Sequence, residues 1–139
     1  MKKFVAILFV SILFLTGCGK SEKVVCTTSQ TMYGIEMSSE LNVYLKDSNF
    51  DKMDMTIDIV IPDSLMSRKA DLVEALESQY ADFETQYGVK PVTKETDKGA
   101  KISMNMNKDQ AVKFSGSNDT KATKKQVIET FEAQGFSCK

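Results

Sequence analysis

The chain has 139 residues, of which 27% are charged, and its 18 basic and 19 acidic side chains give a net charge of −1. This length suits one domain, and a slightly acidic chain lacks the basic surface that binding to nucleic acid requires. The chain contains no histidine, so a site built on the commonest general base and metal ligand of proteins is excluded.

The N-terminal segment has the three parts of a secretory signal. Lys2 and Lys3 precede an apolar stretch over residues 4–15, and small residues then lead into a cysteine in Leu15-Thr16-Gly17-Cys18. This ending resembles the lipobox of bacterial lipoproteins. The resemblance implies that residues 1–17 are cleaved and that Cys18 becomes an N-terminus carrying diacylglycerol and a further acyl chain such as palmitate.

Two alternatives for the same segment are a transmembrane anchor and an ordinary signal peptide with a soluble product. The apolar stretch has about 12 residues, whereas a spanning helix needs about 20. We therefore expect anchoring to membrane lipid through acylated Cys18, on the extracytoplasmic side of the cell membrane. Residues 18–23 are predicted to be the lipidated N-terminus and a tether, and residues 24–139 a single domain.

The three cysteines are consistent with this interpretation. With Cys18 acylated, Cys26 and Cys138 remain as an even pair in an exported compartment, where disulfides are stable. The alternatives are two buried free thiols or a metal pair, but zinc requires three or four ligands. We predict a disulfide between the two ends of the domain.

Three strands are predicted in the first half of the domain. The pattern is β-like from residue 24, residues 37–46 alternate apolar and polar side chains, and residues 47–49 are typical of a turn. The clearest strand covers residues 53–61, which alternate strictly, and Pro62 ends it because proline cannot donate to a ladder.

A long amphipathic helix should follow, with Asp63, Ser64 or Ser67 as N-cap and Gly88 as its end. Residues 89–95 are predicted to form an edge strand that turns at residues 97–99 into a strand over 102–106. Residues 108–120 are polar and predicted to form a loop with at most one helical turn around 109–113.

Thr123 and Gln126 form a capping box that begins a last helix, and Gly135 should end it with Phe136 folding back. The predicted order is β-β-β-α-β-β-α. This indicates an α+β fold, a two-layer sandwich of an antiparallel sheet with helices on one face.

The second half resembles a known family. Tyr87-Gly88-Val89, the turn over residues 94–101, the strand over 102–106 and Phe131-Glu-Ala-Gln-Gly-Phe136 are similar to the YehR-like family of small bacterial lipoproteins. The resemblance covers residues 72–136 and implies a two-layer α/β sandwich. It implies no reaction, because the family has no assigned activity, and it does not extend to the paired Cys26 and Cys138.

Two groups of residues could in principle carry chemistry. Asp51, Asp54 and Asp58 cluster on one strand, where they could form a cation or glycosidic site or simply a solvated sheet face. Met-x-Met pairs occur at residues 53–55 and 104–106, and thioethers favour copper(I), but their parity matches the isoleucines and favours core packing. We therefore expect no metal and no cofactor.

The favoured hypothesis is a non-enzymatic binding or accessory domain that presents the uncovered face of its sheet. Tyr44, Asp54 and Asp58 are the candidate residues of this face, which would bind an unknown protein or small ligand and no nucleic acid. The alternative is a small carboxylate-based hydrolase or carbohydrate-active protein at the cell surface. A concave site that holds the two aspartates with another carboxylate would favour the alternative.

Overall fold

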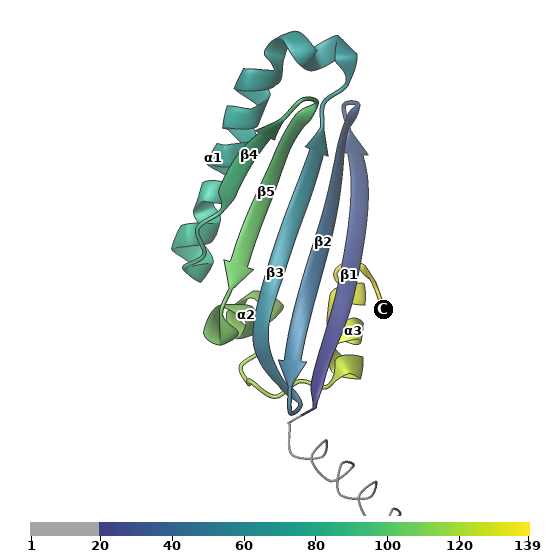
Figure 1. Cartoon of the computed structure of the whole chain (residues 1–139), viewed down its shortest axis with the longest axis vertical. Coiled ribbons are helices and arrows are strands. Elements are labelled where there is room, and N and C mark those ends of the chain that lie inside the picture. The colour runs from purple at the N-terminus through teal and green to yellow at the C-terminus, as the bar shows by residue number, and fades with distance from the viewer. Residues whose placement is uncertain (1–19) are drawn as a thin grey trace, which may run out of the picture.

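The computed structural model describes residues 20–139, in which a six-stranded antiparallel sheet forms one layer and helices form the other (Figure 1). In chain order the elements are β1 (Ser21–Met32), β2 (Ile35–Lys46), β3 (Asn49–Val60), a 3₁₀ turn η1 (Asp63–Arg68), α1 (Lys69–Tyr87), β4 (Val92–Thr96), β5 (Gly99–Met106), α2 (Lys108–Ser115), α3 (Lys124–Glu132) and β6 (Ser137–Cys138).

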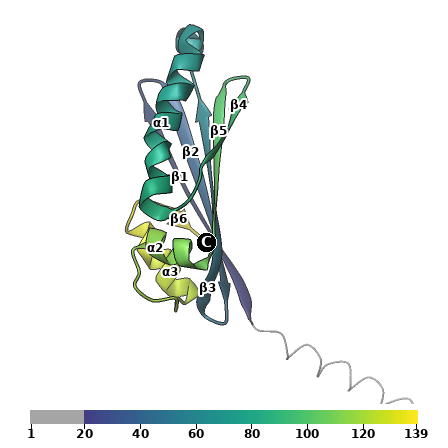
Figure 2. The ribbon, with the colours of Figure 1, turned by 90° about the vertical axis from the view of Figure 1, so that its left-hand side faces the viewer.

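The sheet has the strand order β4-β5-β3-β2-β1-β6. The first three strands have twelve residues each and are joined by two consecutive hairpin turns. The helix α1 then connects β3 to the hairpin of β4 and β5. Figure 2 shows α1, α2 and α3 on the same side of the sheet, so its other face is open. The α+β class and the two-layer arrangement were both predicted.

The core lies between the sheet and the helices and follows the period of two along the strands. On β3 the side chains of Met53, Met55, Ile57 and Ile59 are all buried, while the residues between them face the open side. The two Met-x-Met pairs therefore belong to the core, as their parity predicted. Val73 of α1 and Phe131 of α3 are buried from the helical side.

The helix signals at Gly88 and at the C-terminus were predicted correctly. Gly88 ends α1 with a φ of 71°, a left-handed conformation that glycine adopts readily. After α3, the Phe136 N–H donates to the Phe131 carbonyl oxygen at 3.1 Å and the Gly135 N–H to that of Glu132 at 3.0 Å. These two bonds form the expected Schellman motif.

The prediction for residues 108–120 was wrong, because α2 is an eight-residue helix. Asn107 and Gln110 form a capping box of the same kind as Thr123 and Gln126, with both hydrogen bonds at 3.0 Å. Ala111 is fully buried and holds the helix against the core. With β6 added at the end, the observed order is β-β-β-α-β-β-α-α-β.

Three predicted boundaries also require correction. Residues 21–23, assigned to the tether, are the start of β1 and pair with β2, which satisfies their backbone groups. None of the three suggested N-caps accepts a backbone N–H with its side chain, because the chain enters α1 through the 3₁₀ turn, where the Leu65 N–H donates to the Pro62 carbonyl oxygen. The edge strand begins at Val92 rather than at residue 89.

Candidate functional site

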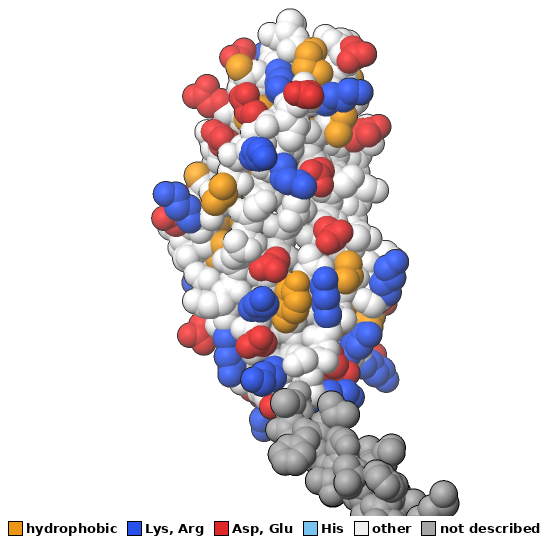
Figure 3. Space-filling view, in the orientation of Figure 1, with side chains coloured by type: hydrophobic (Ala, Val, Ile, Leu, Met, Phe, Trp, Pro, Cys, Tyr) orange, Lys and Arg blue, Asp and Glu red, His pale blue; other side chains and the backbone are white. Residues whose placement is uncertain are grey.

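The open face of the sheet is polar and contains charges of both signs. Figure 3 views this face and shows lysine and carboxylate side chains intermixed, with hydrophobic side chains scattered among them. The residues between the buried positions of β1, β2, β3 and β5 supply these side chains. Tyr44, Asp54 and Asp58 all project from this face, as their parity predicted.

Tyr44 projects from this face near the end of β2. It lies opposite Lys23 of β1 and Lys52 of β3, and the two ammonium nitrogens lie 5.5 and 4.7 Å from the centroid of its ring. Cations at such distances are attracted by the negative face of the ring. The arrangement holds an aromatic surface between two positive charges, which suits an anionic or planar ligand.

Asn42 lies beside Tyr44 and was not anticipated from the sequence. Its amide nitrogen donates to Glu40 Oε1 at 3.1 Å, whereas its buried amide oxygen has no hydrogen-bond partner among residues 20–139. Buried polar atoms are usually paired. Asp54 of β3 lies directly opposite Asn42 of β2, and Asn105 of β5 lies opposite Asp54 on the other side of β3.

The two predicted aspartates have different surroundings. Asp58 forms an ion pair with Lys101 at 3.7 Å, and it lines a hollow of about 570 Å³ that Glu40 also lines. The remaining walls come from the adjacent parts of β1 and β2 and from residues 135–137. Asp54 does not line this hollow. Asp58 and Glu40 therefore line the same hollow, although the sequence did not indicate Glu40 as a site residue. Asp54 does not belong to this pair.

A second hollow, of about 820 Å³, lies between the end of α2 and α3. Phe50, Lys121, Glu129 and Phe131 are among the residues that line it, and its polar and apolar walls are mixed. No motif in the sequence indicated this hollow, because its walls come from three separate segments. Asp51, the third aspartate of the predicted cluster, is exposed and lines neither hollow.

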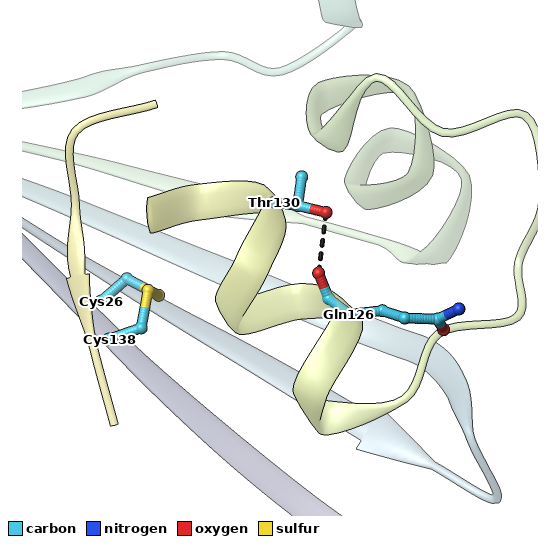
Figure 4. The surroundings of a disulfide bond; sticks show 4 residues. All are labelled: Cys26, Gln126, Thr130 and Cys138. Carbon is cyan, nitrogen blue, oxygen red and sulfur yellow. Dashed lines mark hydrogen bonds between the residues drawn. A yellow bond between two sulfur atoms is a disulfide. The ribbon is translucent and has the colours of Figure 1, made fainter. Parts of the chain in front are cut away.

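Cys26 and Cys138 are brought together at the edge of the sheet. They are opposite residues of β1 and β6, with a Cα–Cα distance of 4.0 Å and an S–S distance of 2.03 Å. Val25 and Lys139 exchange two backbone hydrogen bonds of 2.9 Å beside them. Figure 4 shows the pair next to α3, in which the Thr130 hydroxyl donates to the Gln126 carbonyl oxygen at 2.8 Å. Cys18 lies outside the described residues.

Within residues 20–139, no group of three acidic or cysteine side chains is placed to hold a metal ion. No helix of this part of the chain is long and apolar enough to span a membrane. Comparison of the chain with protein-family models, curated proteins and solved structures found no match.

Proposed function

We propose that the protein is a bacterial lipoprotein, anchored through acylated Cys18 on the extracytoplasmic side of the cell membrane, whose open sheet face binds a partner protein or a small ligand. The Leu15-Thr16-Gly17-Cys18 motif supports the anchor. In the sequence only Gly19 and Lys20 stand between Cys18 and Ser21, the first residue of β1.

The observation that carries the binding role is the open face around Tyr44. The helices cover only the other face, so an aromatic ring flanked by Lys23 and Lys52 is available on the open face. Aromatic side chains supply large contact areas at binding surfaces, and the two ammonium groups favour a ligand with negative charge.

Site-specific photo-crosslinking in intact cells tests this role. A photoreactive amino acid at Thr56, in the middle of the open face, should form a crosslinked product with the bound partner. The same amino acid at the exposed Ser78 of α1 is the matched control and should not. Tyr44→Ala should weaken the product at Thr56. Equal products at both positions, or none at Thr56, would contradict binding through this face.

The hydrolase alternative is supported by one observation, the hollow that Glu40 and Asp58 both line. Two carboxylates beside a bound glycan could act as acid and base or nucleophile. The test is release of new reducing ends from purified cell-wall polysaccharide by the native protein. Loss of this activity in Glu40→Gln and Asp58→Asn but not in Asp54→Asn would establish the alternative, and no release by the native protein would reject it.

A further inference from the structure

The start of the folded domain lies very close to the proposed lipid attachment. The Lys20 N–H donates to Asp47 Oδ1 at 3.0 Å, and the Asp47 N–H donates to the Lys20 carbonyl oxygen at 2.9 Å. Only Gly19 separates Lys20 from Cys18. Since one residue spans at most about 3.6 Å of extended chain, Lys20 must lie within about 7 Å of the acylated residue.

Three segments meet at this end of the sheet, and we call them the anchor end: residues 20–23, 44–52 and 117–125. Ser21 pairs with Lys46, and Asn49 at the β2–β3 turn forms a bridge with Lys121. The Phe50 N–H donates to the Thr120 carbonyl oxygen at 2.8 Å, which fixes the loop before α3 beside the turn. A short lipid attachment at Cys18 therefore brings all three segments to the membrane surface.

The anchor end differs in charge from the rest of the molecule. Its three segments contain seven lysines and four carboxylates, a net charge of +3, whereas the rest of the chain after residue 17 has nine cationic and fifteen anionic side chains, a net charge of −6. Figure 3 shows lysine side chains gathered over this end. A molecule with this asymmetry is oriented by a negatively charged surface.

Two of the seven lysines form ion pairs, Lys20 with Glu22 at 3.3 Å and Lys125 with Glu129 at 3.8 Å. Both pairs are exposed on the lysine side, where ion pairs are weak and screened. Lys23 and Lys52 lie over the Tyr44 ring, and no carboxylate of residues 20–139 pairs with the remaining Lys46, Lys121 and Lys124. Three of the seven lysines, Lys46, Lys121 and Lys124, are thus free to meet another surface.

We infer that the anchor end is a docking surface for the anionic headgroups of the membrane that holds the protein. This inference depends on the lipid anchor of the proposed function and adds an orientation to it. Basic residues next to a lipid anchor strengthen its attachment to an anionic leaflet. The long strands then extend away from the membrane, and the β1–β2 turn at Tyr33 and Gly34 lies at the end of the sheet opposite the anchor end.

Tryptophan fluorescence can test the orientation, because the chain contains no tryptophan. Asn118→Trp places a single tryptophan at an exposed, uncharged position of the anchor end. Tyr33→Trp is the matched control, because Tyr33 is 88% exposed at the opposite end of β1. The acylated full-length protein is reconstituted into vesicles of phosphatidylglycerol and brominated phosphatidylcholine, and quenching by the brominated chains is measured.

We expect several-fold more quenching of the tryptophan at 118 than of that at 33. The difference should fall in vesicles of brominated phosphatidylcholine alone, and also in about 1 M salt, where the Debye length is about 3 Å. The double variant Lys124→Gln/Lys125→Gln should reduce the difference in quenching. The control Lys94→Gln/Lys98→Gln removes the same charge from the β4–β5 hairpin and should leave the difference unchanged.

The outcomes separate the two proposals. Suppose that the purified protein carries acyl mass, but that both tryptophans are quenched equally or that quenching at 118 does not depend on lipid charge. The docking surface is then overturned, while the lipid anchor of the proposed function is retained. If the protein from membranes carries no acyl mass, the anchor and the docking surface both fail.

Discussion

Met55 of β3 lies directly opposite Met104 of β5, and both side chains are buried in the core, at 8% and 1% exposure. Met53 and Met106 form a second opposite pair in the same two strands. The two Met-x-Met motifs thus face each other across one strand pair, and packing between sheet and helices accounts for their position.

Substitution of Met104 should distinguish a core role from a metal role. Met104→Leu conserves the volume and should lower the free energy of unfolding by less than about 1.5 kcal/mol in urea denaturation. Met104→Asp should unfold the domain, because it places a charge in an apolar layer. Tight stoichiometric copper(I) uptake by the native protein, measured against a chromophoric chelator and lost in Met53→Leu or Met104→Leu, would contradict the core role.

The bond between Cys26 and Cys138 should join the ends of the domain in the exported protein. Its mass without reduction should be two hydrogens lighter than after reduction. The bond closes a separation of 112 residues, and Cys138→Ser should lower the free energy of unfolding by up to about 4.7 kcal/mol. Thiols at both positions that react with an alkylating reagent under oxidising conditions would refute the disulfide.

Gly99 should not tolerate a larger side chain. A Cβ at this position would lie 1.9 Å from the Ile59 carbonyl oxygen, so β3 and β5 would have to separate. We expect Gly99→Ala to lower the free energy of unfolding by about 1–3 kcal/mol or more. Ser103→Ala, on the open face of the same strand, is the control and should change it by less than about 0.5 kcal/mol. Equal stability of the two variants would contradict the tight contact.

Cys18 should be required for attachment to the membrane. Cys18→Ala removes the thiol that accepts the lipid, so the protein should be found as uncleaved precursor or be released from the membrane fraction. Incorporation of labelled palmitate, followed by immunoprecipitation, measures the acylation directly. Cys138→Ser is the control and should keep the label. Unchanged labelling of Cys18→Ala would reject the lipoprotein proposal.

Tyr80 should make the stability depend on alkaline pH. Burial in the packing of α1 raises the pKa of the Tyr80 hydroxyl above its ordinary value of 10.0. The folded state therefore disfavours the phenolate, so this contribution to stability is complete below pH 10 and is lost as the pH rises through the folded-state pKa. In urea titrations above pH 10, Tyr80→Phe should lose stability less steeply than the native protein. Identical slopes would contradict this contribution.

Much of the fold could be predicted because its signals are local. The alternation around Met53 and Ile57 identifies a half-buried strand from neighbouring residues alone, and Gly88 marks a helix end through its own backbone freedom. The helix α2 could also have been predicted, since Asn107 and Gln110 repeat the capping-box spacing of Thr123 and Gln126.

The candidate site could be predicted only in part. The parity of Tyr44, Asp54 and Asp58 places all three on the same face, because successive side chains of a strand point to opposite sides. The alignment of β1, β2 and β3 decides which cations lie beside Tyr44 and that Asp58 and Glu40 line the same hollow. A shift of the strand register by one residue would change the neighbours of every side chain.

By itself, the sequence determined the types of β1 to β5, α1 and α3, the polar face and the pairing candidates Cys26 and Cys138. Only the tertiary structure decided that β3 pairs with β5 across α1, that residues 21–23 extend β1, and that β6 forms beside Cys26. The physical reason is that periodicity and capping depend on residues a few positions apart. Strand pairing is instead decided by which distant backbone groups meet when the common core is buried.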